Sequence, residues 1–95
     1  MRVRWTKPAL HSLEEIQDYI AQDSPVAAYA VAHDLVDRTE RGLSSSPKMG
    51  RSGRALNTRE LVFADLPYIV VYRVTDAVEI LAVVHTARAW PASFD

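Results

Sequence analysis

The sequence predicts an α+β domain in which a helical hairpin packs on one face of a mostly antiparallel four-stranded sheet. Two observations lead to this fold class. Apolar residues recur at helical spacing from residue 9 to residue 43, and two runs rich in β-branched and aromatic residues follow between residues 68 and 84. Shorter strand-like segments precede and follow the helices, so the expected order is β-α-α-β-β-β.

The chain opens with a short strand that leads directly into a helix. Residues Arg2–Thr6 alternate with a period of two and place Val3 and Trp5 on one side, as in a strand with one buried face. Lys7-Pro8 then begins a helix, because proline at the first helical position loses no hydrogen bond. The apolar stripe of this helix is formed by Ala9, Leu13, Ile16 and Ile20.

The second helix follows after a very short turn. Ser24 can cap the free amide groups of its first turn, and Pro25 again suits the first helical position. Its apolar positions are Ala27, Ala28, Val31, Ala32, Leu35, Val36, Thr39 and Leu43. Gly42 and the segment Ser44–Pro47 end it, and two helices joined so closely form an αα-hairpin.

The net charge of −1 conceals two regions of opposite charge. Residues 14–40 carry many acids with Arg38 as their one basic side chain other than His33, whereas residues 48–59 carry Lys48, Arg51, Arg54 and Arg59 and no acid. The segment Lys48–Asn57 has no apolar period and is expected to be a loop, after which Thr58–Phe63 resumes strand character. This distribution predicts a local anion-facing patch but not a uniformly basic nucleic-acid binder.

The last two strands are expected to form a hairpin from Tyr68 to His85 around the turn Thr75-Asp76-Ala77. A three-residue turn places Arg73 opposite Glu79 and separates an uncharged face from a mixed one. The uncharged face comprises Tyr68, Val70, Tyr72, Val74, Val78, Ile80, Ala82 and Val84. The mixed face comprises Ile69, Val71, Arg73, Glu79, Leu81, Val83 and His85, and it ends beside Arg88.

Length and composition indicate one folded domain spanning residues 1–95. Apolar residues make up 48% and charged residues 24% of the chain, which is close to the globular average. Cysteine is absent, and histidines and carboxylates show no convincing metal spacing, so neither a metal nor a cofactor is expected. No signal peptide and no apolar run of membrane-spanning length is recognisable, so a cytoplasmic location without a membrane partner is predicted.

An ordered set of short motifs resembles the toxins of the RelE/ParE superfamily of type II toxin–antitoxin modules, and more closely its ParE (plasmid stabilisation) branch. The motifs cover nearly the whole chain. They are Pro8-Ala-Leu-His-Ser-Leu-Glu-Glu-Ile16, Tyr19-Ile20, Ala28-Tyr29, Pro47 with Gly50-Arg51, Arg59-Glu60-Leu61, Tyr68-Ile-Val-Val-Tyr72, and Val84-His85-Thr-Ala-Arg88-Ala-Trp90-Pro91. The resemblance implies a toxin that is neutralised by a cognate antitoxin, ParD-like or related.

The resemblance implies one of two activities, inhibition of DNA gyrase without catalysis or cleavage of mRNA on the ribosome. In the mRNA-cutting branch an arginine usually follows the first tyrosine of the Tyr-x-x-Val-Tyr strand, but this chain has Ile69 at that position. In the same branch a tyrosine or histidine often follows the last strand closely, but this chain has Ala87 and Arg88 there. The sequence pI of about 6.3 also disfavours a ribosome binder. The leading hypothesis is therefore a non-catalytic gyrase inhibitor without direct nucleic-acid binding. The alternatives are a ribosome-dependent mRNA endoribonuclease and an attenuated toxin that only regulates its operon.

The candidate site residues follow from these hypotheses. The predicted target-binding residues are Arg51, Arg59, Arg73, His85, Arg88 and Trp90, and an endoribonuclease would use Arg59, Arg73, His85 and Arg88. The predicted antitoxin-binding residues are those on the outer rim of the helical hairpin among Leu13, Ile16, Tyr29, Val31 and Leu35, which are otherwise core residues. Simpler interpretations remain open: Arg73 and Glu79 as a cross-strand ion pair, His85 as a strand cap, and Trp90 as a shield for the hairpin.

Overall fold

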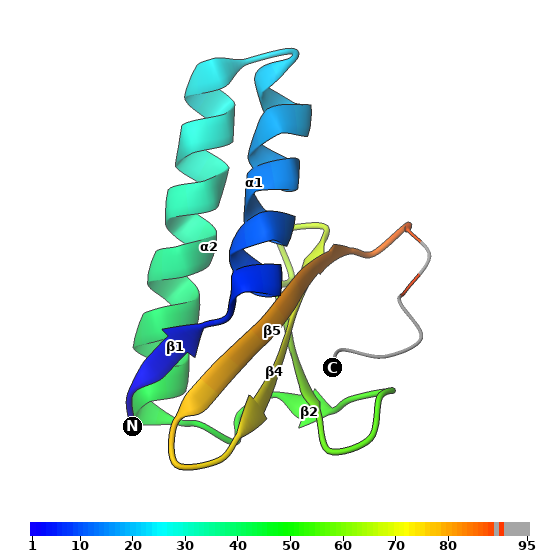
Figure 1. Cartoon of the computed structure of the whole chain (residues 1–95). Helices are drawn as coiled ribbons and strands as arrows, with labels where there is room; N and C mark the ends of the chain where they lie inside the picture. The colour runs from blue at the N-terminus through cyan, green and yellow to red at the C-terminus, as the bar shows by residue number, and fades with distance from the viewer. Residues whose placement is uncertain (89, 91–95) are drawn as a thin grey trace.

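In the computed structural model, which describes residues 1–88 and 90, two helices pack against one face of a twisted sheet (Figure 1). The elements in chain order are β1 (Val3–Trp5), α1 (Lys7–Ala21), α2 (Pro25–Ser45), β2 (Arg51–Ser52), β3 (Arg59–Val62), β4 (Tyr68–Val74) and β5 (Val78–His85). The α+β class and the helical hairpin are as predicted. Within the described residues no helix is both long enough and apolar enough to cross a membrane.

The sheet has five strands within the described residues, one more than predicted. Its order is β1-β5-β4-β3-β2, with β1 parallel to β5 and the other pairs antiparallel. The additional strand β2 lies in the connector that was expected to be a loop, where Arg51 pairs with Glu60 and Ser52 with Arg59. Both β2 residues are exposed, so this strand lacks the apolar alternation that marks a strand in a sequence.

Both helices begin at the predicted positions, and a hydroxyl side chain caps each of them. The hydroxyl of Thr6 accepts a hydrogen bond from the Ala9 N–H at 3.3 Å, and the hydroxyl of Ser24 accepts one from the Ala27 N–H at 3.1 Å. Each side chain thereby satisfies an amide that has no partner within its helix. A proline lies in the first turn of each helix, as expected.

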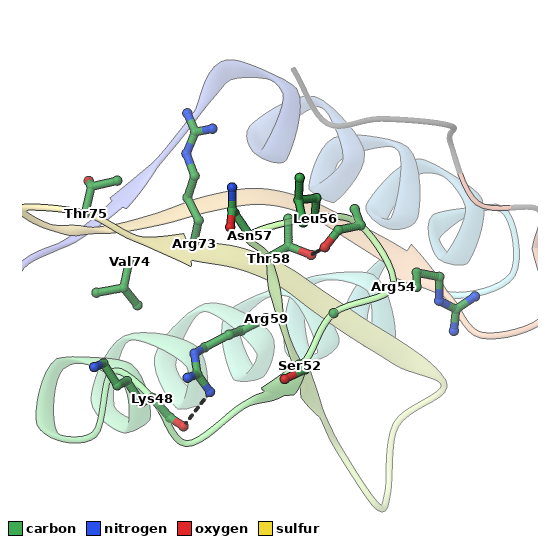
Figure 2. A pocket seen from close by; sticks show the side chains of 12 residues that line it. Lys48, Ser52, Arg54, Leu56, Asn57, Thr58, Arg59, Arg73, Val74 and Thr75 are labelled. Carbon is green, nitrogen blue, oxygen red and sulfur yellow. Dashed lines mark hydrogen bonds between the residues drawn. The ribbon is translucent and has the colours of Figure 1, made fainter.

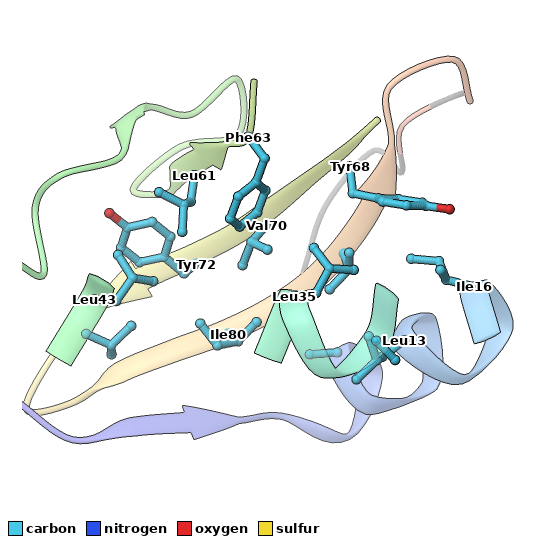
Figure 3. Close-up of a cluster of buried hydrophobic side chains, with 14 residues drawn as sticks. Leu13, Ile16, Leu35, Leu43, Leu61, Phe63, Tyr68, Val70, Tyr72 and Ile80 are labelled. Carbon is cyan, nitrogen blue, oxygen red and sulfur yellow. The ribbon is translucent and has the colours of Figure 1, made fainter. Parts of the chain in front are cut away.

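The main hydrophobic core lies between the helical hairpin and the sheet (Figure 3). It contains Ala9, Leu13, Ile16, Ala32, Leu35, Leu43, Leu61, Phe63, Tyr68, Val70, Tyr72, Val78, Ile80 and Val83. Leu35 and Leu43 of α2 are completely buried against the sheet. Truncating such a leucine to alanine typically costs about 2–5 kcal/mol, so α2 owes its position to this contact more than to its helix propensity.

The hairpin register confirms one prediction and corrects another. Val74 pairs with Val78 across a three-residue turn, and Arg73 lies opposite Glu79, as predicted. A register shift then follows, because Val71 pairs with Ala82 and Tyr72 with Ile80. Leu81 is thus an extra residue in a β-bulge.

Because side chains alternate along a strand, the bulge exchanges the two faces of β5 beyond it. Val83 belongs to the main core, and His85 pairs with Tyr68 on that side of the sheet. Ala82 and Val84 instead lie on the other face, where a second cluster contains Ile69, Val71 and Val84 with Ala82 and Trp90 packed against it. The predicted faces of Ala82, Val83, Val84 and His85 were therefore wrong, as was the prediction of one mixed face ending in Arg73, His85 and Arg88.

Candidate functional site

A buried glutamate, Glu79, holds two arginines on the face of the sheet that the helices leave uncovered. It lies opposite Arg73 of β4 and opposite Arg4 of β1. Its Oε1 accepts a hydrogen bond from Arg73 Nε at 2.8 Å, and its Oε2 forms an ion pair with Arg4. The Arg73–Glu79 pair exists as predicted. However, it is not a simple exposed pair, because Glu79 is buried and is shared between two cations.

A second buried glutamate, Glu60, holds two more arginines on the same face. Its Oε1 accepts hydrogen bonds from Arg51 Nε at 3.1 Å and Nη2 at 2.9 Å, and its Oε2 accepts the Arg54 backbone N–H at 2.8 Å. Burial alone would raise the pKa of Glu60, but the hydrogen bonds and charges of Arg54 and Arg51 together outweigh it and lower the pKa. Glu60 is therefore ionised at neutral pH.

These four arginines and two glutamates form a surface that we call the arginine face, defined by Arg4, Arg51, Arg54, Arg73, Glu60 and Glu79. The arginine side chains are 44% to 56% exposed, whereas the two glutamate side chains are 2% and 9% exposed. Among these residues the positive charges outnumber the negative ones. The carboxylates fix the guanidinium groups from beneath, and the outward N–H groups are left available for an anionic or polar partner.

Trp90 lies next to the arginine face. Its ring packs against the cluster of Ile69, Val71 and Val84, and the guanidinium carbon of Arg54 lies 3.6 Å from the ring centroid. This distance is within the range of a cation–π interaction. The position agrees with the interpretation of Trp90 as a shield for the hairpin, and it also brings a half-buried aromatic ring to the edge of a cationic surface.

Arg59 lies on the opposite side of β3 from Glu60, directly across from Tyr72. Its Nη1 donates hydrogen bonds to the backbone oxygens of Gly50 at 2.8 Å and Lys48 at 3.1 Å. The Tyr72 hydroxyl in turn accepts the Gly50 N–H at 2.9 Å, and burial raises the pKa of Tyr72. Arg59 and Arg73 both line an open groove of about 880 Å³, with Lys48 and Arg59 on one side and Arg73 on the other (Figure 2).

His85 and Arg88 lie at the other end of the hairpin. The His85 ring meets Tyr68 edge to face with centroids 5.4 Å apart, and its Nδ1 accepts the Ala87 N–H at 3.0 Å. Arg88 lies over the ring of Tyr19 on α1, with its guanidinium carbon 5.6 Å from the centroid. Burial raises the pKa of Tyr68.

The four residues of the endoribonuclease hypothesis are thus divided between two places. His85 pairs with Tyr68 at the start of β4, whereas Arg59 pairs with Tyr72 and Arg73 follows it near the end of that strand. At about 3.4 Å per residue, the rows of Tyr68 and Arg73 are about 17 Å apart along the strand. The structure brings Arg51, Arg73 and Trp90 to one face, places Arg59 in the adjoining groove, and separates His85 and Arg88 from them.

The predicted antitoxin-binding residues also differ in their exposure. Leu13, Ile16 and Leu35 are buried in the main core, and Val31 is half-buried against it. Only Tyr29, with 70% of its surface exposed, is available to a partner, and its ring stacks against that of His33 at a centroid distance of 6.0 Å. The core interpretation therefore applies to the three buried residues.

Sequence reasoning missed Arg4, Arg54 and Glu60 as members of the arginine face, and it did not predict that Glu79 is buried between two arginines. The available signal was alternation, because Arg4 lies between two core-facing residues of β1 and Glu60 lies between Arg59 and Leu61 of β3. Within residues 1–88 and 90, no group of histidine, aspartate and glutamate side chains is arranged to hold a metal ion.

Comparisons with known proteins agree with this architecture. A sequence profile described as the ParE toxin of type II toxin-antitoxin systems, parDE, matches residues 3–90. The chain is 47% identical over 90 residues to Y4kP of Sinorhizobium fredii (strain NBRC 101917 / NGR234), which is named as a candidate toxin, and the match covers 95% of this chain and 93% of that protein. It is 41% identical over 88 residues to toxin RelE2 of Caulobacter vibrioides, covering 92% and 97%.

One solved structure has a similar fold. A chain from the "Chromosomal ParDE TA system from P. aeruginosa" is 25% identical and superposes with a TM-score of 0.80, covering 90% of this chain and 95% of that chain. ParE and RelE names both occur among these relatives, so the names alone do not distinguish the two activities.

Proposed function

Because the chain belongs to the ParE toxin family of type II toxin–antitoxin systems, we propose that it acts by inhibiting DNA gyrase without being a catalyst, and that a cognate antitoxin neutralises it. The observation that carries this proposal is the separation of His85 and Arg88 from Arg59 and Arg73. RNA cleavage through the 2′-hydroxyl needs a general base, a general acid and positive charge around one phosphate. A set divided along the length of a strand does not provide them together.

The surroundings of Ile69 support the same proposal. In the mRNA-cutting branch of the superfamily, an arginine usually occupies this position. Here the side chain is 5% exposed and packs with Val71 and Val84 beneath Trp90. An arginine at position 69 would have to leave this apolar cluster, because burying an unpaired charge is costly. The apolar packing therefore fits the lack of a cleaving arginine at this position.

We assign target binding to the arginine face and Trp90, and antitoxin binding to the outer surface of the helical hairpin around Tyr29. Arginine and tryptophan are enriched among residues that dominate binding energy, and here Arg54 stacks directly on Trp90. Tyr29 lies on α2, which packs on the other face of the sheet. An antitoxin of the ParD type or a related one is the expected partner there.

The proposal is tested with purified protein in two parallel reactions, supercoiling of relaxed plasmid by gyrase and translation of a defined mRNA. We expect loss of supercoiling and intact mRNA. Wild-type supercoiling at every toxin concentration would overturn the proposal. His85→Ala serves as the control, because it should leave gyrase inhibition unchanged.

A second candidate, ribosome-dependent cleavage of mRNA, is favoured by one local arrangement. Tyr19, Tyr68, His85 and Arg88 bring two phenols, an imidazole and a guanidinium into contact at the end of the hairpin. Such groups could serve a phosphodiester without Arg59 and Arg73. Site-specific cuts in translated mRNA that disappear in His85→Ala would place this candidate first.

A further inference from the structure

We propose that the open groove between the end of β4 and the loop of residues 53–58 binds a small nucleotide, a nucleoside diphosphate or triphosphate. The proposal does not depend on the identity of the toxin's target. It rests on three properties of the groove: positive charge that no carboxylate balances, guanidinium groups that are already held in place, and an exposed leucine on the lining loop.

The groove is cationic. Four basic residues line it, and none of its described lining residues is acidic. Arg59 donates only to backbone oxygens, and Lys48 forms no ion pair, so no carboxylate in the part of the chain that the structure describes neutralises either residue. Arg73 shares Glu79 with Arg4, so one carboxylate there faces two cations. A ligand in this groove therefore gains from carrying several negative charges.

Two guanidinium groups of the groove are each held at one end. Arg59 Nη1 donates to Lys48 O at 3.1 Å and to Gly50 O at 2.8 Å, and Arg73 Nε donates to Glu79 at 2.8 Å. Within the described residues, Nε and Nη2 of Arg59 and both Nη groups of Arg73 donate no hydrogen bond. Guanidinium N–H groups suit phosphate oxygens, and groups that are already oriented lose less entropy when a ligand binds.

The cations lie on both sides of the groove, which favours a chain of phosphates over a single one. Arg59 pairs with Tyr72 on the side of the sheet that the helices cover, and alternation sends the next residue, Arg73, to the uncovered side. Figure 2 shows Lys48 and Arg59 on one side of the groove and Arg73 on the other. A single phosphate would meet one side, whereas the linked phosphates of a diphosphate or triphosphate can meet both.

The loop of residues 53–58 offers a surface for the nucleoside. Leu56 is 89% exposed, more than any other large hydrophobic residue in the described part of the chain, and the exposed amide of Asn57 can both donate and accept hydrogen bonds. The Gly53 N–H donates to Thr58 O at 2.8 Å, and the Thr58 hydroxyl donates to Ala55 O at 2.6 Å, so this wall is formed without a ligand. The groove volume of about 880 Å³ lies within the range of small-molecule sites, about 300–1,000 Å³.

Isothermal titration calorimetry of the purified protein with ATP, ADP and AMP tests the proposal. We expect saturable binding of ATP with a Kd below about 1 mM, weaker binding of ADP, and binding of AMP that is weaker than that of ATP by about tenfold or more. Equal affinities for ATP and AMP, or no saturable binding of ATP, would overturn the proposal. A single-stranded oligonucleotide that bound more tightly than ATP would also overturn it, because the groove would then belong to a nucleic-acid strand.

The two lysines of the chain provide a matched pair of variants. Lys48→Glu should weaken ATP binding by about tenfold, since it replaces an attraction by a repulsion. Lys7→Glu, at the start of α1 and outside the groove, should leave ATP binding unchanged. Equal affinities of the two variants for ATP would contradict the assignment of the groove.

The contribution of the nucleoside is tested separately with inorganic tripolyphosphate, which supplies the phosphate chain alone. Because Leu56 is exposed, Leu56→Ala should fold normally. It should weaken ATP binding by about threefold or more and leave the affinity for tripolyphosphate unchanged. If Leu56→Ala bound ATP as tightly as wild type does, the assignment of a nucleoside would be wrong.

Amide chemical shifts locate the bound nucleotide independently of affinity. We expect ATP to shift the amide signals of Asn57, Arg59 and Val74, which line the groove. The Tyr29 amide on α2 is the control and should not move. Shifts that spared the groove residues in the ATP-saturated protein would exclude this site.

Discussion

Replacing Glu60 with glutamine removes the negative charge beneath Arg51 and Arg54 while keeping the shape of the side chain. The carboxylate accepts three hydrogen bonds within 3.1 Å from these two arginines. A glutamine can present its oxygen to one of these donor groups, but its NH₂ then faces the other. The variant therefore places a donor against a donor in a site that is 2% exposed.

The expected loss of stability follows from these contacts. A hydrogen bond to a charged group contributes about 1.5–3 kcal/mol, and removing one partner of a fully buried pair costs about 3–5 kcal/mol. Both arginines are about half exposed and regain water, so we expect about 2 kcal/mol. For a domain of 95 residues this corresponds to a fall in Tm of about 10 °C.

The lowered pKa of Glu60 determines how its contribution to stability changes with pH. Because the folded-state pKa of Glu60 is lowered, its contribution is present above the pKa of the unfolded carboxyl and is lost as the pH falls through the lower folded-state value. The difference in unfolding free energy between wild type and Glu60→Gln should therefore be full at pH 7 and shrink below about pH 4.

The assay is urea unfolding followed by circular dichroism at several pH values. Glu14→Gln is the control, because Glu14 is exposed on α1 and its removal should change stability by less than about 0.5 kcal/mol. Equal stability of Glu60→Gln and wild type at pH 7 would refute the role of Glu60. A difference that persists unchanged at low pH would show that charge is not its cause.

Two further predictions concern the connector and the tail. Gly50→Ala should lower the unfolding free energy by about 1–3 kcal/mol in urea melts, because its Cβ would lie 2.6 Å from the Tyr72 hydroxyl. Gly42→Ala is the control. Its Cβ would lie 3.2 Å from the flexible side chain of Met49, so it should change the unfolding free energy far less. Trp90→Ala should lower the unfolding free energy by about 1–2 kcal/mol, because it uncovers the apolar cluster of Ile69, Val71 and Val84. It should also weaken gyrase inhibition. If neither the unfolding free energy nor the inhibition changed, the docked position of Trp90 would be contradicted.

Local rules predicted the order of the elements other than β2, both helix starts and the pairing of Arg73 with Glu79, because caps and turn length act within a few residues. The bulge at Leu81 was not predictable in this way. The run around it is apolar on both faces, so a one-residue slip leaves no charged residue to mark the change. The correct side for His85 depends on that slip.

The arginine face was predicted only in part, because its center is a pair of buried acids. Glu60 reads as an exposed strand residue until the connector folds back and brings Arg51 and Arg54 over it. That approach depends on Gly50 and Gly53, where a Cβ would lie within 3 Å of neighbouring atoms. A close contact between segments that are distant in the sequence produces no periodic pattern in the sequence.

The central claim is that the two sides of the sheet serve different partners, and one paired measurement tests it. Arg73→Ala leaves Glu79 paired with Arg4, and Tyr29→Ala alters an exposed side chain, so both variants should fold. We expect Arg73→Ala to lose gyrase inhibition and keep antitoxin binding, and Tyr29→Ala to do the reverse. If one variant lost both properties, or if Arg73→Ala inhibited gyrase as well as wild type does, the assignment of the two faces would be contradicted.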